Sequence, residues 1–471
     1  MIFTYKLKYI LYCLVLLIIE YLFYSLTIIP TFESLSVLGF FGILQLYISV
    51  YSWKKLTLHS FVPYTIFLFA AYIFTFGQSF LYPFNKVPES RDMLMYFAIN
   101  EIFYAQILTL LFLNSFHIGA LISISNRKIE RIYNSYLELE DLEKKYLKKI
   151  GLIFSLISLI PFLLETYFNF QVIRLMGYGG LYQAPVKVGM QNITSVLANF
   201  FIPGLLCLLF SLKNKQRVII LLLLVLYSLM LVFLGMRSDG VVLLVIILLF
   251  YHLFIKRIKV KGVLLISVFS IFFMGILSVI AYTRDDASVS MIEALTKANL
   301  FDSCFDAISE MGGSMQPLVQ TIDIIPDKEG YRYGTTYLYA LTTIIPNLNF
   351  WDIHPAKLHA EMSVWLQNAL GINYGPGFSI AAEAYANGGV FGFIFMLLLG
   401  YIYGGILNIS GKSNLRILPI ALSFIFLFLA THTVRNSFIS IIRTFCYHIL
   451  PIYLYVRYKV KQFKDHKSTI Q

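Results

Sequence analysis

Charged residues are scarce in this chain of 471 residues: Asp, Glu, Lys and Arg make up 13% of it, against 58% apolar residues. A soluble globular domain carries about 25% charged residues, so the composition excludes an ordinary soluble protein. The alternating short strands of a membrane barrel are also missing. Apolar runs of about 20 residues recur instead, and each can cross a bilayer as a helix. The sequence therefore predicts an all-helical polytopic membrane protein.

The sequence also has few cysteines and lacks a glycine-rich phosphate-binding loop. The four cysteines show no metal-binding spacing, so we expect neither a disulfide framework nor a metal centre. No glycine-rich phosphate loop is present, and no nucleotide or other cofactor is expected. The first apolar run lacks a small-residue cleavage site and is interpreted as a retained span. The net charge of +12 comes from basic residues at span ends, which does not indicate nucleic-acid binding.

The apolar runs predict about twelve membrane spans. They are expected at residues 9–29, 34–53, 60–81, 94–114, 150–168, 194–212, 218–235, 240–255, 263–282, 388–408, 416–434 and 437–457. Lys and Arg cluster in alternate connections and in the C-terminal tail. All these clusters face one side if both termini are cytoplasmic, and the positive-inside rule favours that orientation.

The charged segment 125–149 falls on the cytoplasmic side of this arrangement. Its Glu and Lys residues are spaced for pairs four residues apart, which predicts a solvated linker helix; a regulatory docking site is the alternative. It belongs to a first section, residues 1–282, with nine spans. The last section, residues 388–471, holds three spans and a basic tail.

Between these sections lies a long polar segment, residues 283–387, expected on the outer side of the membrane. A connection of this length is uncommon unless it has a function. A capping box at Ser290 predicts an amphipathic helix ending near Met311. Further short helices are expected at 336–345 and 360–370. No internal repeat is visible, so a transporter built from two repeated halves is not supported.

Arginines at span ends converge on this outer face. Arg237 lies in a short turn between two spans, Arg284 follows the ninth span, and Arg435 lies in the turn between the last two spans. The planar guanidinium suits phosphate oxygens, so together they are candidates for binding a diphosphate. Arg332 is a fourth candidate. Each has a structural alternative, such as pairing of Arg237 with Asp239.

Glu383 is the candidate general base. It lies one turn inside a helix for which Ser379 is a plausible N-cap, and the positive helix end favours anionic groups nearby. Its carboxylate has the chemistry to take a proton from a sugar hydroxyl. The alternative is a buried salt bridge with one of the arginines. His354 and His432 are the other candidate bases.

Several further features have two interpretations. Asp285 and Asp286 could bind a divalent cation that bridges phosphates, or pair with Arg284. Tyr and Trp residues of the outer segments could form an interfacial belt or stack on sugars. Glu20, Glu101 and Arg443 lie within apolar spans, where each is expected to face the bundle interior and be paired.

Three motifs in the second half of the chain resemble one family. They are residues 235–240 (Gly-Met-Arg-Ser-Asp-Gly), residues 333–337 (Tyr-Gly-Thr-Thr-Tyr) followed by Ile345-Pro346, and residues 377–389. The motifs and the layout, with one large late outer loop, are similar to Wzy-type O-antigen and capsular polysaccharide repeat-unit polymerases. The resemblance in layout covers nearly the whole chain.

This resemblance implies a membrane glycosyltransferase related to the GT-C group, in the bacterial cytoplasmic membrane. Its expected substrates are undecaprenyl-diphosphate-linked oligosaccharides of lipopolysaccharide or capsule, polymerised at the outer face. A chain-length regulator and a flippase are the partners it implies, besides membrane lipids. The alternatives are a ligase that transfers finished glycan, a lipid-linked oligosaccharide flippase or transporter, and a non-catalytic assembly partner.

Overall fold

The computed structural model describes residues 2–124, 134–176, 190–233, 237–259, 261–262, 273, 300–345, 350–409 and 417–470. Every regular element within these ranges is helical, as predicted. Nine helices in this part of the chain are long and apolar enough to cross a membrane, and Pro63–Phe76 and Ser238–Phe254 are shorter apolar helices. Each of the eleven expected spans in the described ranges coincides with one of these helices. The expected span 263–282 lies outside them, except for residue 273.

The chain divides into two compact units built from interleaved segments. The first comprises Met1–Asn126, Lys256–Gly405 and Thr431–Ser440; the second comprises Arg127–Ile255, Ile406–Ala430 and Ile441–Gln471. The described part of the polar segment 283–387 therefore belongs to the same unit as the first four helices. This division follows tertiary contacts, whereas the three sections expected from hydropathy follow chain order.

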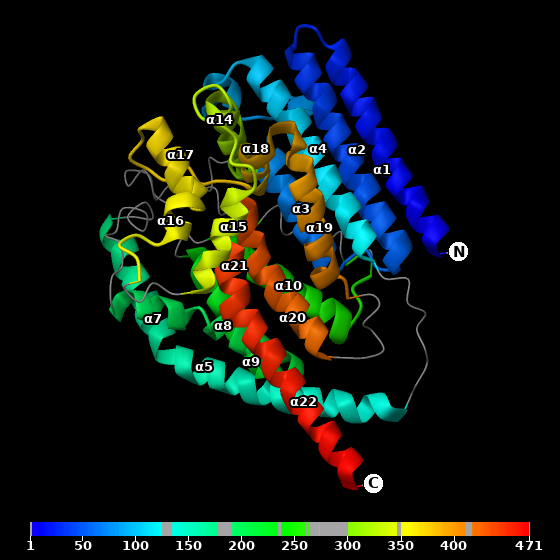
Figure 1. Cartoon of the computed structure of the whole chain (residues 1–471), viewed down its shortest axis with the longest axis vertical. Coiled ribbons are helices and arrows are strands. Elements are labelled where there is room, and N and C mark those ends of the chain that lie inside the picture. The colour runs from blue at the N-terminus through cyan, green and yellow to red at the C-terminus, as the bar shows by residue number, and fades with distance from the viewer. Residues whose placement is uncertain are drawn as a thin grey trace. The chain divides into compact units, whose positions relative to one another are not determined.

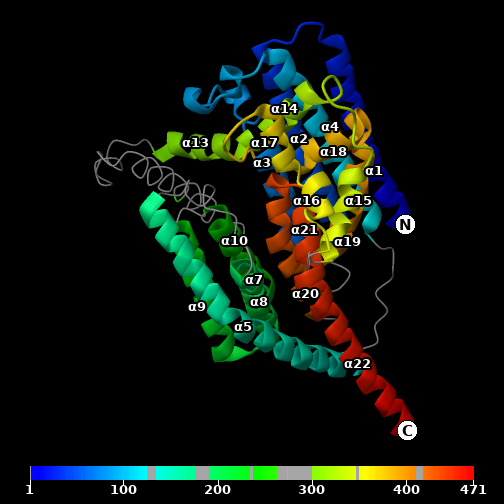
Figure 2. The same ribbon diagram turned by 60° about the vertical axis from the view of Figure 1, so that its left-hand side comes forward.

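A helical bundle forms one side of the first unit. It consists of α1 (Ile2–Leu26), α2 (Phe32–Thr57), α3 (Pro63–Phe76) and α4 (Ile99–Ser123), which lie side by side in Figures 1 and 2. Residues 78–98 connect α3 to α4 through three short 3-10 helices, Tyr82–Phe84, Glu89–Arg91 and Met93–Met95. The bundle core is mostly apolar and aromatic, as expected where helices pack in a membrane.

Helix α19 (Phe393–Leu407) packs on α4 with the two backbones in contact. A Cβ added to Gly400 would collide with the carbonyl of Phe116, and one added to Gly119 would collide with the carbonyl of Leu397. Small residues allow this close approach between membrane helices, where van der Waals packing is a main source of attraction.

The polar segment folds into short helices on the first unit. They are α13 (Leu300–Gly312), the 3-10 turn Gly313–Met315, α14 (Gln316–Ile324), α15 (Thr335–Leu341), the 3-10 turn Thr342–Ile344, α16 (Pro355–His359) and α17 (Met362–Leu370). The expected helices at 336–345 and 360–370 are confirmed within two residues. Helix α13 ends at the predicted glycine, and its expected start at Ser290 lies outside the described residues.

The second unit contains α5 (Asn134–Met176), a helix of 43 residues. It also contains α7 (Met190–Ala198), α8 (Phe201–Ser211), α9 (Asn214–Phe233), α10 (Arg237–Phe254), α20 (Ile417–Ala430), most of α21 (Ile439–Thr444), a π-helical turn at Phe445–Ile449 and α22 (Leu450–Ile470). The described part of the expected linker helix, from Asn134 onward, is therefore continuous with the fifth span.

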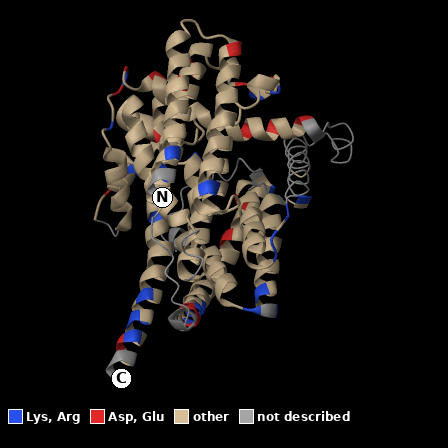
Figure 3. Cartoon of the chain, turned by 90° about the vertical axis from the view of Figure 1, so that its right-hand side faces the viewer, with Lys and Arg blue, Asp and Glu red and all other residues tan. Residues whose placement is uncertain are grey.

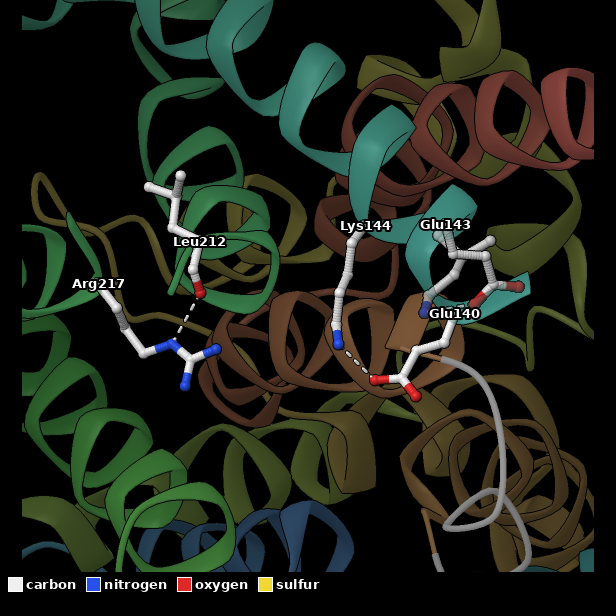
Figure 4. A network of polar contacts seen from close by, with 6 residues as sticks. Glu140, Glu143, Lys144, Leu212 and Arg217 are labelled. Atoms are coloured by element: carbon white, nitrogen blue, oxygen red, sulfur yellow. Dashed lines mark hydrogen bonds and ion pairs between the residues drawn. The ribbon is translucent and has the colours of Figure 1, made fainter. Parts of the chain in front are cut away.

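Polar contacts anchor the charged end of α5 (Figure 4). Lys144 donates to Glu140 one turn earlier, which confirms a predicted pair four residues apart. Glu143 accepts the backbone N–H of Leu418, at 3.2 Å, at the start of α20. A separate hydrogen bond in Figure 4 joins α9 to the end of α8, where Arg217 donates from Nε to the carbonyl of Leu212, at 3.0 Å. The last turns of α22 carry the basic tail, visible as repeated Lys and Arg in Figure 3.

Candidate active site

Helix α18 (Ile380–Gly388) is the centre of the candidate site. Ser379 caps it as predicted, because its Oγ accepts the N–H of Ala382 at 3.2 Å. Residues 380–387 are all buried, so this helix runs through the interior of the first unit. It ends at Gly389, whose φ of +56° is a conformation that side-chain-bearing residues rarely adopt. The expected tenth span continues beyond this break as α19.

Glu383 on α18 is fully buried and joins two distant segments. Its Oε1 accepts the hydroxyl of Thr336 at 2.8 Å, and its Oε2 accepts the backbone N–H of Phe438 at 2.6 Å. It forms no ion pair with the residues that the structure describes, so the alternative of a buried salt bridge with an arginine is not seen there. Hydrogen bonds to both oxygens compensate for removing the carboxylate from water.

Asn387, one turn after Glu383, completes the junction. Its Nδ2 donates to Thr336 Oγ1 at 2.7 Å and to the carbonyl of Glu383 at 2.8 Å. Its Oδ1 accepts the N–H of Gly334 at 2.9 Å. The backbone N–H groups of Arg332 and Tyr333 donate to the carbonyls of Ala386 and Asn387, at 2.9 and 3.0 Å. Hydrogen bonds thus join the motifs 333–337 and 377–389 to each other.

Tyr337 follows Thr336 on α15 and lies next to this junction. Its ring packs against Phe395 and Phe438, with centroids 5.1 and 5.2 Å apart. Its hydroxyl is buried and has no hydrogen-bond partner among the described residues. Burial, together with the nearby Glu383 and Tyr403, raises the pKa of the Tyr337 phenol well above its usual value. The phenol is therefore neutral and remains a donor.

The turn after α20 is the third segment at this site. Residues Thr431–Arg435 form a 3-10 helix, η8. Side chains three residues apart eclipse in an ideal 3-10 helix, and His432 and Arg435 have this spacing. The carbonyl of Arg435 accepts the N–H of Phe378 at 3.3 Å, just before the cap of α18. His432 is half-buried and Arg435 is exposed.

The guanidinium of Arg435 is available to a ligand. It stacks over the ring of Phe74 at 5.2 Å from the centroid. Within the described part of the chain it forms no ion pair with an acid. An exposed, oriented guanidinium without a carboxylate partner retains all its donors for phosphate oxygens.

Arg332 has a different environment. It forms an ion pair with Glu329, and its guanidinium stacks over the ring of Trp365 at 5.4 Å. Trp365 Nε1 also donates to Glu329, at 3.0 Å. The buried Arg332 Nε has no partner among the described residues. Arg332 therefore lies in a packed cluster, with less freedom to bind a diphosphate than Arg435 has.

His354 has both ring nitrogens engaged. Nδ1 accepts the N–H of Ala356 at 3.2 Å and so caps α16, which fixes the proton on Nε2. Nε2 then donates to the carbonyl of Ile345, at 3.0 Å. A ring held in this way has a structural role as the cap of a short helix.

The remaining sequence candidates are not placed as side chains. Arg237 is the first residue of α10, and its side chain is not described. Arg284, Asp285 and Asp286 lie outside the described residues. Their expected roles at a diphosphate stay predictions. Thr336 and Asn387, which the sequence reasoning did not single out, proved to be the partners of Glu383; both lie inside the quoted motifs.

The helical architecture and the buried junction define a polytopic membrane protein with a polar site built from its late segments. The family model of the O-antigen polysaccharide polymerase Wzy matches residues 9–467, and the chain belongs to this family. Members of the family are glycosyltransferase-like enzymes that act on lipid-linked oligosaccharide repeat units in the membrane. No curated protein and no solved structure matches the chain significantly.

Proposed function

We propose that this protein polymerises undecaprenyl-diphosphate-linked repeat units into a surface polysaccharide, O-antigen or capsule, at the outer face of the bacterial cytoplasmic membrane. A hydroxyl of one lipid-linked repeat unit attacks the anomeric carbon of the growing chain. The bond from that carbon to the diphosphate oxygen breaks, and undecaprenyl diphosphate leaves with the bonding electrons. The reaction needs a cation at the leaving diphosphate and a base for the hydroxyl proton.

The convergence of three segments on Glu383 is the observation that supports this site most directly. Residues 333–337, 377–389 and 431–438 are far apart in the chain, yet the carboxylate of Glu383 and its helix bind the other two segments. These hydrogen bonds hold in place the segment that carries the exposed Arg435 and the half-buried His432. Sites held by packed and hydrogen-bonded neighbours maintain the geometry that group transfer needs.

Arg435 is assigned to the diphosphate. It is the described candidate arginine that is both exposed and without an acidic partner among the described residues, and its contact with Phe74 orients the guanidinium. Bidentate contacts to phosphate oxygens would stabilise the negative charge that develops as the leaving group departs. Arg237 and Arg284 remain proposed second contributors from the same outer face.

His432 is assigned as the base, and Glu383 as a positioning residue. Glu383 is fully buried and both carboxylate oxygens already accept protein hydrogen bonds, so a sugar hydroxyl would reach it only after the packing around α18 opens. The three-residue spacing of His432 and Arg435 in η8 favours a proton acceptor next to the proposed diphosphate contact. Glu383 fixes this segment through Phe438.

The orientation rests on the distribution of basic residues. The connections and the tail that carry Lys and Arg alternate along the chain with the two segments that contain Glu383 and Arg435. The positive-inside rule assigns the basic clusters to the cytoplasm. The site then faces outward, where lipid-linked repeat units would be polymerised. A chain-length regulator and a flippase are proposed as partners.

The experiment is reconstitution of the purified full-length protein in proteoliposomes with undecaprenyl-diphosphate-linked repeat units. A ladder of products with successive repeat numbers is expected on a gel. Transfer of preformed glycan to another acceptor, with no lengthening of lipid-linked chains, would instead identify a ligase. Movement of intact repeat units across the bilayer without new glycosidic bonds would identify a flippase.

A further inference from the structure

The bundle α1–α4 contains a second cluster of polar side chains, remote in sequence from the candidate active site. The cluster, here named the polar layer, has a member on each of the four helices and consists of Glu20, Gln45, Ser49, Tyr72, Gln106 and Asn114. All six residues are buried; Glu20 is only 3% exposed. The expectation that Glu20 faces the interior is confirmed, but its expected partner is not found among the described residues, where neither carboxylate oxygen accepts a hydrogen bond.

Hydrogen bonds between helices set the levels of these residues along the bundle. Asn114 on α4 donates to the carbonyl of Cys13 on α1 at 3.1 Å, and Gln45 on α2 donates to the carbonyl of Leu110 on α4 at 2.9 Å. Gln106, Leu110 and Asn114 are four residues apart, so they share one face of α4. Glu20 lies two turns from Cys13 on the same side of α1, which brings it to the level of Gln106.

Helix α3 closes the layer through Tyr72. The Tyr72 hydroxyl lies near Ser49 and within electrostatic reach of Glu20. These two hydroxyls are buried and pair with each other. Polar side chains from α1, α2, α3 and α4 are thus buried in the interior of one bundle, over about two helical turns.

An adjacent polar cluster provides a contrast. His117 on α4 is fully buried, but its Nε2 lies 2.7 Å from Ser52 Oγ and its Nδ1 lies 2.8 Å from the Tyr64 hydroxyl. Every side-chain nitrogen of this histidine is therefore satisfied by the protein. The polar layer differs: five of its carboxylate and amide oxygens and one amide nitrogen have no protein partner within the described ranges.

The chemistry of the layer indicates what would satisfy it. Unpaired buried polar groups are costly in a membrane helix, and an isolated carboxylate more so. Carboxylate, amide and hydroxyl oxygens are ligands for hard cations. The layer supplies one formal negative charge, which one monovalent cation neutralises and a divalent ion would overcompensate. We propose that the polar layer binds an alkali-metal cation, with the Glu20 carboxylate as its charged ligand and side-chain oxygens of neighbouring helices as neutral ligands.

The test uses the purified full-length protein in detergent. Its thermal unfolding midpoint is followed in NaCl and in KCl, against N-methyl-D-glucamine chloride at the same ionic strength. A ligand of the native state raises stability with the logarithm of its concentration once its dissociation constant is exceeded. We expect the midpoint to rise with at least one alkali cation and to stay constant with the organic cation. Equal midpoints in all three salts would overturn the proposal.

Two variants and a control locate the effect. Glu20→Gln removes the charge and should abolish the cation-dependent shift, and Gln106→Met removes an oxygen ligand and should move the midpoint shift to higher cation concentration. Glu89→Gln makes the same chemical change as Glu20→Gln at an exposed site and should respond as the wild type does. A full cation response in Glu20→Gln, or its loss in Glu89→Gln, would refute the assignment to the polar layer.

Discussion

The hydroxyl of Thr336 donates to Glu383 Oε1 across 2.8 Å, joining residues that are 47 positions apart in the chain. Thr336 lies on α15 in the long polar segment, and Glu383 lies on the buried helix α18. Because Asn387 also donates to Thr336 Oγ1, the hydroxyl is both donor and acceptor in the same junction. The polar segment is thereby attached to the interior of its unit.

Replacing Thr336 with Val should destabilise the protein. Valine has the shape of threonine but leaves Glu383 Oε1 without its hydrogen-bond donor, while Asn387 Nδ2 keeps the carbonyl of Glu383 as an acceptor. An unsatisfied buried polar group costs about 1–3 kcal/mol. Thr335→Val is the matched control, because its hydroxyl donates to Arg332 at an exposed site. SDS titration of both purified variants in mixed micelles measures the difference. Similar stabilities would show that the junction contributes little.

Asn387→Asp should be more damaging than the change at Thr336. The carboxylate cannot donate the two hydrogen bonds that Asn387 Nδ2 now makes, and it places a second acid beside the buried Glu383. Removing the partners of buried charged groups costs about 3–5 kcal/mol, so the variant should accumulate poorly in membranes. Asn368→Asp on the exposed side of α17 should accumulate normally. Equal membrane levels of the two variants would contradict the proposed network.

Arg435→Ala should abolish chain lengthening while the protein still folds. Its guanidinium is exposed and stacked on Phe74, so stability should change little, whereas loss of a transition-state donor lowers rates by about 10²–10³. Arg435→Lys should restore only part of the activity, because lysine lacks the planar fork. Glycan ladders from cells with equal amounts of each variant provide the measurement.

The control for this prediction is Arg91→Ala. Arg91 is another exposed arginine of the first unit and pairs with Glu310 at 3.6 Å. An exposed ion pair contributes about 0–1 kcal/mol, so this variant should retain full-length ladders. Long chains in Arg435→Ala, or their loss in both variants, would count against the diphosphate role.

The dependence of rate on pH should separate the three candidate bases. A general base contributes about 10²–10⁴ to the rate, and its protonation lowers activity at acidic pH. His432→Gln should lose this contribution to the rate. It should also lose the acidic limb of the profile, the fall in rate toward acidic pH. Glu383→Gln should lower activity but retain the acidic limb, because its carboxylate positions Phe438.

His354→Gln is the comparison within this experiment. Nδ1 of His354 caps α16 and Nε2 donates to the carbonyl of Ile345, so the variant should keep the wild-type pH profile with somewhat lower stability. An acidic limb that survives in His432→Gln and disappears in Glu383→Gln would reverse the assignment and make Glu383 the base.

Much of the local structure could be predicted from the chain itself. Apolar runs specify helices in a bilayer because backbone groups must pair within each segment, and each expected span in the described ranges is a helix. Ser379 was predicted as a cap because a serine hydroxyl satisfies a free N–H at a helix start. These features depend on neighbours within a few residues, which is why the sequence reveals them.

The partners of Glu383 could not be derived in this way. Its neighbours Thr336 and Phe438 are brought to it by the packing of α15 and the turn after α20 against α18, and hydropathy gives no information on which outer segments meet. The same holds for Glu20, whose interior position was expected but whose lack of a protein partner was not.

The sequence by itself determined the class of protein, the positions of most spans and the location of polar chemistry in late segments, since these follow from transfer of side chains and backbone between water and lipid. Only the tertiary structure decided that Glu383 is a buried junction, that Arg435 is exposed beside it and that Arg332 is engaged elsewhere. Those distinctions depend on hydrogen bonds and contacts between residues far apart in the chain, which no local pattern encodes.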